Sequence, residues 1–160
     1  MTIATKWKTM DGKEGVDLNN VQATIDVAVS PEYPAAPMEL GDRVQGNNGS
    51  EWLYVIASAT VTAFNMVAIN SLFGAVNITT AIQASGIYTF GFVQTQGLVS
   101  TDGSSLNNAQ PGQRFWALMK VAQGARFNLT ASVSAALGAK LYVSQSIPGF
   151  LTTSTTTSST

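Results

Sequence analysis

Short runs in which apolar and polar residues alternate dominate the chain from about residue 40 onward. Residues 115–121 place Phe115, Ala117 and Met119 on one side, and residues 126–133 alternate in the same way. A period of two is typical of a β-strand with one buried face, because successive side chains of a strand point to opposite sides. The strands predicted here are residues 52–58, 60–69, 78–84, 87–94, 115–121, 126–133 and 140–144.

Turn residues separate these runs. Residues 46–49 read Gly-Asn-Asn-Gly, and both residue types accept the positive φ that a tight turn needs. Further turns are expected at residues 85–86 and 123–124, and residues 104–110 read as a polar loop. Strands at spacings near ten residues predict an all-β fold, a small sandwich or barrel-like domain of short antiparallel strands.

Signals for helices are sparse in this sequence. No segment combines a good N-cap, an apolar period of 3.6 residues and ten residues of helix formers. Only residues 67–76 and 132–139 have room for a short helical turn. Helices are therefore expected to be minor elements of the fold.

The first forty residues form a region of different character. Residues 21–29 alternate as a strand does, and Pro31, Pro34 and Pro37 follow within seven residues of one another. Proline favours extended backbone at its own position and at the preceding one, so residues 30–38 are predicted to be an extended connector. We interpret residues 1–40 as an extended N-terminal arm with one strand; an ordinary first strand of the main domain is the alternative. Residues 41–151 are the predicted β domain, and residues 152–160 a Ser/Thr-rich tail.

Charge is scarce, and its distribution excludes several kinds of chemistry. Only 11% of residues are charged, and the chain has no His and no Cys. Disulfides, zinc sites built on Cys and His, and nucleophilic sites that need a histidine base are therefore impossible. The net charge of -1 and the scattered cations argue against nucleic-acid binding, which needs a basic patch.

Neutral polar residues replace the missing charges. Thr, Ser, Asn and Gln make up 52 of the 160 residues, and no charged residue occurs from Trp52 to Thr101. Polar residues interrupt this window every few positions, so it is not a membrane span. The N-terminus lacks the apolar stretch of a signal peptide, and we expect a soluble protein made in a cytoplasm.

The sequence contains few candidates for a catalytic or ligand-binding site. Glu51 and Asp102 flank the uncharged window and are the pair of acids considered for a cleft, but two solvated acids at turn ends are the simpler interpretation. Aromatic residues of strands 52–58 and 115–121 are candidates for a sugar-binding groove, or for core and interface anchors. The sequence thus predicts no enzyme activity, no cofactor and no metal site.

Candidate partner contacts fall in the predicted arm. Trp7 lies among Lys6, Lys8 and Thr9, where an aromatic ring either anchors in a partner's pocket or packs back on its own domain. Pro31, Tyr33 and Pro34 belong to the predicted connector. These four residues, Trp7, Pro31, Tyr33 and Pro34, are the predicted contacts.

Several stretches of the chain resemble a known family. Residues 41–58 read GDRVQGNNGSEWLYVIAS, residues 79–86 read TTAIQASG, and GFVQ follows at 91–94. Residues 112–119 read GQRFWALM; LGAKLYVSQ at 137–145 and PGFL at 148–151 end the series. In order and pattern these stretches are similar to the capsid decoration, or cement, proteins of tailed phages, over roughly residues 40–151.

This resemblance implies a structural virion protein without enzyme activity. Such proteins commonly sit as trimers on the outer surface of the phage head, where they staple neighbouring major capsid proteins and stabilise the shell. The expected partners are therefore the major capsid protein and further copies of this chain, with the arm as a clamp. Two alternatives stay open: another virion component, such as a head fibre base, collar or tail protein, and a carbohydrate-binding β module.

Overall fold

The computed structural model describes residues 18, 38–94, 98–99, 105–106, 108–120, 125–130, 135–136 and 138–153, with backbone alone at 98–99 and 105–106. The strands of the main sheet are β1 (Arg43–Gln45), β2 (Glu51–Ala57), β4 (Met66–Ile69), β5 (Gly74–Asn77), β6 (Thr89–Val93) and β10 (Arg114–Lys120). The other described elements are η1 (Asn47–Gly49), β3 (Val61–Thr62), α1 (Thr80–Ser85), β7 (Leu98–Val99), β8 (Ser105–Leu106), β9 (Asn108–Ala109), β11 (Tyr142–Val143) and β12 (Leu151–Thr152).

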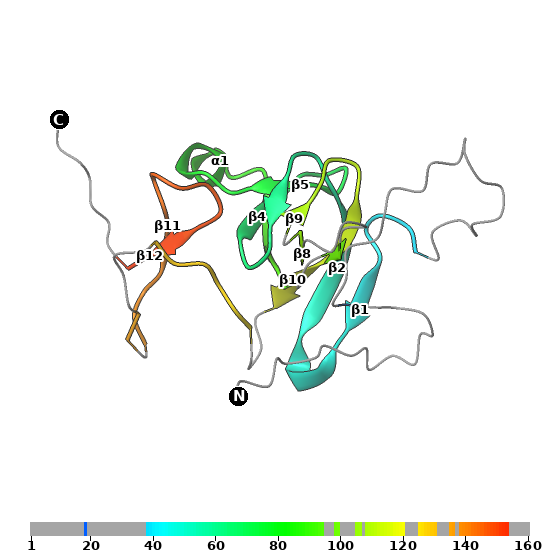
Figure 1. The fold of residues 1–160 in the computed structure, drawn as a ribbon, viewed down its shortest axis with the longest axis horizontal. Coiled ribbons are helices and arrows are strands. Elements are labelled where there is room, and N and C mark those ends of the chain that lie inside the picture. The colour runs from blue at the N-terminus through cyan, green and yellow to red at the C-terminus, as the bar shows by residue number, and fades with distance from the viewer. Residues whose placement is uncertain are drawn as a thin grey trace.

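The main sheet curls into a barrel that closes on β2 (Figure 1). The strand order is β1-β2-β10-β6-β4-β5, and the end of β2 also pairs in parallel with β5, Ile56 opposite Gly74. The start of the same β2 edge pairs with β1, Gln45 opposite Glu51. Five strands thus form a closed ring, and the predicted all-β class is confirmed as a barrel, with one parallel pair where antiparallel pairs were expected.

The barrel interior holds the largest core cluster. Every barrel strand contributes to it, as do β3 and β9, whose Val61 and Ala109 are fully buried. The predicted alternation in β10 is confirmed, because Phe115 and Ala117 point into this interior and Met119 packs against it. The buried members of the interior cluster are Leu53, Val55, Ala57, Val61, Val67, Ile69, Ala75, Val93, Ala109, Phe115 and Ala117.

The other face of β2 and β10 is also buried, which explains why these strands are apolar at nearly every position. We call the outward side chains of β1, β2 and β10 the aromatic face: Val44, Trp52, Tyr54, Trp116 and Leu118. The rings of Tyr54 and Trp116 lie 4.9 Å apart. Leu18 is fully buried in the same cluster, and Met38, Leu40, Phe92 and Ala125 pack against it.

A third cluster covers the outer side of β4 and β6. Its buried members are Ala68, Ile78 and Val143, so the C-terminal segment that carries β11 packs here. Met66, Tyr88 and Phe90 are only partly buried against it. Figure 1 shows β11 and β12 on this side of the barrel, away from β1 and β2.

Buried asparagine amides anchor the C-terminal segments to the barrel. The Asn65 side chain, 2% exposed, donates to Asn77 Oδ1 at 3.1 Å and accepts from Asn128 Nδ2 at 2.8 Å. The main chain of Gly149 donates to Ile78 and accepts from Met66, both at 2.8 Å. Gly149 has a φ of +83°, and a Cβ here would overlap the Asn65 amide, so glycine is required at this contact.

Residues 78–84 are the clearest wrong prediction, because a helix replaces the expected strand. The alternating β-branched residues there resemble a strand, but Thr79 caps α1 by accepting a hydrogen bond from the Ile82 amide at 3.2 Å. Gly86 ends the helix in the left-handed region at a φ of 69°. An N-cap threonine and a C-terminal glycine therefore outweigh the alternation.

Other boundaries also need correction. Residues 60–69 form two strands, β3 and β4, because the chain turns between them at Phe64, whose φ is +65°. Residues 67–76 are the β4–β5 hairpin and contain no helical turn. The expected polar loop 104–110 contains β8 and β9. In place of the strand 126–133, the described residues 126–130 contribute only a bridge from Leu129 to Leu151.

The remaining predictions fall into two groups. The turn at 46–49 is confirmed by η1, in which Asn48 has a φ of 59°. β6 and β11 lie within their predicted ranges, and β2 and β10 each begin and end one residue earlier than predicted. The strand 21–29, the connector up to residue 37, the turn 123–124 and the tail from residue 154 lie outside the described residues.

Candidate interaction surfaces

The four predicted partner contacts, Trp7, Pro31, Tyr33 and Pro34, lie outside the described residues. Of the predicted arm, the structure describes Leu18 and residues 38–40. Leu18 is buried in the cluster of the aromatic face, and Met38 and Leu40 pack against that cluster. At least one residue of the predicted arm thus packs on the barrel.

The candidate sugar-binding aromatics expose no side chain to solvent in this structure. Trp52, Tyr54, Phe115 and Trp116 are all fully buried. Burial raises the pKa of the Tyr54 hydroxyl, and the charge and hydrogen bond of Arg114 partly oppose that shift. These rings therefore act as packing elements, the core or interface role that the sequence also allowed.

The acid pair considered for a cleft is not assembled in the described residues. Asp102 lies outside them, and Glu51 Oε1 accepts from Lys120 Nζ at 3.2 Å on the surface. A hollow of about 260 Å³ lies beside Glu51 and is lined by Arg43, Val44, Gln45, Glu51 and Trp52. Within the described part of the chain, no three acidic or histidine side chains are grouped as metal ligands.

A stretch of chain without charged residues forms the opposite side of the barrel, where the Arg126 guanidinium lies 6.0 Å from the centre of the Phe64 ring. We call residues 61–93, which carry β3, β4, β5, α1 and β6, the uncharged half, because they contain no Asp, Glu, Lys or Arg. Its outer side bears two large apolar side chains that are mostly exposed, Leu72 at 79% and Ile87 at 76%.

The β4–β5 turn holds Leu72 outward. Asn70 Oδ1 accepts hydrogen bonds from the amides of Leu72 and Gly74, both at 2.9 Å. Phe73 takes a φ of +61° and packs against the barrel interior, where its ring fills the space beside Gly41. A left-handed conformation costs a residue other than glycine about 1–3 kcal/mol, so the packing of the partly buried Phe73 ring fixes the turn while Leu72 points to solvent.

Ile87 leaves the barrel at the same end. It follows the left-handed Gly86 at the end of α1, and β6 then pairs with β4, Thr89 opposite Ile69. Because Ile69 immediately precedes the β4–β5 turn, this register brings the turn and the α1–β6 link to one rim. Neither residue was predicted to be exposed, although each is an apolar residue within or directly after a turn.

Comparison of the chain with protein-family models, with curated proteins and with solved structures finds no match. Among the described residues, no helix is long and apolar enough to cross a membrane.

Proposed function

We propose that this protein is a capsid decoration protein, which binds the outer surface of a tailed-phage head through its uncharged half. The observation that carries the proposal is the pair of exposed apolar side chains, Leu72 and Ile87, on the uncharged half. Surfaces of this kind dock without stripping water from charges, and the centres of protein interfaces are depleted of charge. The family resemblance of residues 40–151 supports the same reading.

The binding mode is stapling by many copies. A small barrel supplies a compact body, and repeated weak contacts add up when symmetry holds several copies on one shell. We further propose that the chain acts as a homotrimer, with the major capsid protein as its partner. No catalytic step is part of this function.

The test adds purified protein to expanded heads of the encoding phage that lack it. The native chain binds saturably and appears at fixed symmetry positions in images of the particle. A Leu72→Ser/Ile87→Ser variant binds about a hundredfold more weakly, since burying two such side chains contributes several kcal/mol. The matched control, Leu141→Ser/Ile147→Ser, changes two half-exposed apolar residues of the C-terminal segment and binds like the native chain.

Two results would overturn the proposal. One is the absence of saturable binding to heads, above all if the native protein is found only in tail fractions. The other is unchanged binding by the Leu72→Ser/Ile87→Ser variant. Thermal unfolding of each variant checks that a loss of binding is not a loss of folding.

A further inference from the structure

One cation borders the uncharged half. Arg126 is exposed, and its guanidinium lies 6.0 Å from the centre of the Phe64 ring, a distance at which a cation is still attracted to an aromatic face. Among the described residues, no carboxylate pairs with this guanidinium; the ion pair found there joins Glu51 to Lys120. Arg126 therefore offers hydrogen-bond donors to a partner, beside a surface that has no charge of its own.

Amide side chains fix the main chain around Arg126. The Gln94 side chain, 3% exposed, accepts from the Arg126 amide at 2.9 Å and donates to the Arg126 carbonyl at 2.8 Å. Two residues further on, the Asn128 amide donates to the Phe64 carbonyl at 3.0 Å, and the Asn128 side chain donates to the Ala63 carbonyl at 2.8 Å. These bonds hold Arg126 beside Phe64 before any partner arrives, which lowers the entropy that binding costs.

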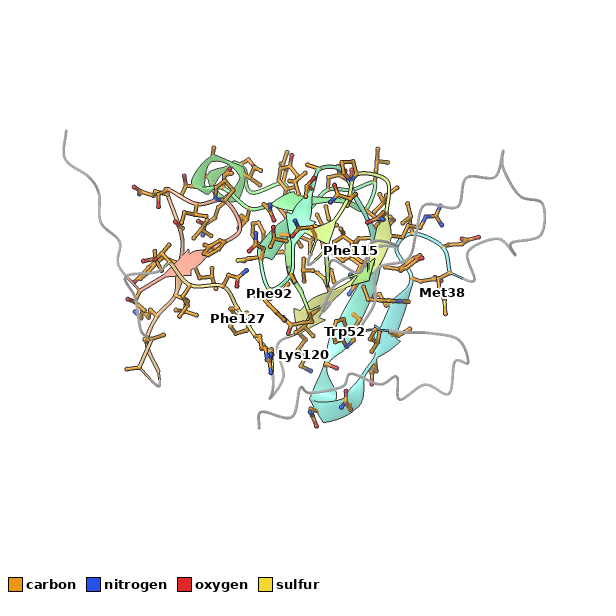
Figure 2. The ribbon with its side chains drawn as sticks, in the orientation of Figure 1. Met38, Trp52, Phe92, Phe115, Lys120 and Phe127 are labelled. Carbon is orange, nitrogen blue, oxygen red and sulfur yellow. The ribbon has the colours of Figure 1, made fainter. Side chains whose placement is uncertain are left out.

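Three partly exposed phenylalanine rings accompany the guanidinium. Phe64 has a φ of +65°, an unfavourable conformation for a bulky residue that the surrounding structure must hold and that is typical of binding sites. The rings of Phe92 and Phe127 lie 4.6 Å apart, and both are only partly buried (Figure 2). We call Phe64, Phe92, Arg126 and Phe127 the Arg126 cluster.

We propose that the Arg126 cluster is a docking site for an acidic side chain of a partner protein, an Asp or Glu carboxylate flanked by apolar residues. A guanidinium is a planar fork that binds a carboxylate through two parallel hydrogen bonds. Aromatic residues and Arg are the types enriched at the centres of protein interfaces. The charge selects an anion, and the exposed parts of the rings favour a protein segment over a small free anion, because they bury further apolar area on contact.

The inference deepens the proposed function by naming the chemistry of the partner surface. It rests on that function only for the identity of the partner, the major capsid protein. The Arg126 cluster itself can be tested on the isolated chain.

The first experiment needs no phage heads. The isotope-labelled chain is titrated with the capped dipeptide N-acetyl-Glu-Phe-amide, and NMR follows the Arg126 Nε–H and Phe127 amide signals. The acidic peptide is expected to shift both signals saturably, with a dissociation constant of about 1 mM. The uncharged control, N-acetyl-Gln-Phe-amide, binds at least about tenfold more weakly, because hydrogen bonds to charged groups are the stronger ones. The Arg126→Gln chain loses the same factor toward the acidic peptide.

The absence of saturable binding, or an equal response to the two peptides, overturns the proposal. So does a response at Lys140, an exposed cation of the C-terminal segment, that equals the response at Arg126, since it would mean attraction to any surface cation. Arg126→Gln keeps the main-chain bonds to Gln94. Native positions of the Gln94 side-chain amide signals therefore show that this variant is folded.

The second experiment measures the role of the site in binding to heads. At low salt, Arg126→Gln binds about tenfold more weakly than the native chain, and Arg126→Lys, which keeps the charge but not the planar fork, loses less. The difference shrinks at 1 M salt, where charges are screened within about 3 Å. Lys140→Gln is the matched control and binds like the native chain. Unchanged binding by Arg126→Gln at low salt overturns the assignment of this site to the capsid protein. If the native chain does not bind heads, the proposed function fails, and the peptide titration alone decides the inference.

Discussion

The two sides of the barrel differ in how completely they bury their large apolar side chains. The aromatic face packs its largest side chains on β2 and β10 and buries them completely. Lys120, at the end of β10 (Figure 2), stays largely in solvent and pairs with Glu51. The uncharged half has a smaller outer cluster, partly buried aromatics, and Leu72 and Ile87 in solvent. On the first side, buried apolar surface stabilises the barrel. On the second side, exposed apolar surface remains available for a partner.

The largest expected effect lies on the aromatic face. Trp52→Ala removes a fully buried ring next to Val44 and Leu118, and such changes cost about 3–5 kcal/mol. Leu72→Ala, on the uncharged half, is expected to change stability by less than about 0.5 kcal/mol. Urea unfolding of both variants measures the contrast.

The predicted contrast is wrong if Trp52→Ala and Leu72→Ala lower the free energy of unfolding by similar amounts. That result would mean that Leu72 is covered by part of the same chain in solution. Ile87→Ala, which shortens the other mostly exposed apolar side chain of the uncharged half, is the matched control and should change stability as little as Leu72→Ala.

The next effect concerns how the C-terminal segment is held on the uncharged half. Asn65→Ala leaves the Asn77 and Asn128 side chains without their buried partner, which costs about 1–3 kcal/mol. Hydrogen exchange is expected to speed up at the amides of Gly149 and Leu151, which bond to this part of the fold. The aromatic face should keep its protection.

Gln83→Ala, an exposed amide on α1, is the matched control and should leave both protection and stability unchanged. Equal loss of protection on the two sides of the barrel would show that the C-terminal segment and the aromatic face unfold as one unit. The comparison between the sides would then describe packing but not stability.

The sequence predicted the strands best where a period of two coincides with β-branched and aromatic residues. β2 and β10 meet that condition, and both were located from the pattern. The pattern also placed Trp52 and Trp116 as core or interface anchors, and the structure buries both. Local periodicity was sufficient because each of these strands is long and has a neighbour on both edges.

Three features could not be predicted from the local sequence pattern. Barrel closure depends on pairing Ile56 with Gly74, a contact between distant residues that no period encodes. The helix α1 was missed because Ile78, Thr80 and Ile82 alternate like a strand, although Thr79 and Gly86 are capping signals. Leu72 and Ile87 were missed because an apolar residue is ordinarily expected inside, and only the turn geometry places them outside.

A smaller effect separates the two tryptophans within the aromatic face. Both are fully buried, but Trp52 Nε1 donates to Ser50 Oγ whereas Trp116 Nε1 has no acceptor among the described residues. Replacement by phenylalanine removes a similar volume at each site. In the single chain, Trp52→Phe should therefore cost about 1 kcal/mol more than Trp116→Phe.

The smallest expected effect is at the charged margin. The Glu51–Lys120 ion pair joins β2 to β10 beside a register shift, with both side chains largely in solvent. Exposed pairs of this kind contribute about 0–1 kcal/mol, so Lys120→Gln should lower stability slightly at low salt and not at all at 1 M salt, where charges are screened within about 3 Å. Gln113→Ala is the uncharged control. If Lys120→Gln lowered the free energy of unfolding more than Trp52→Phe does, the ion pair would contribute more to the stability of this side than the aromatic packing.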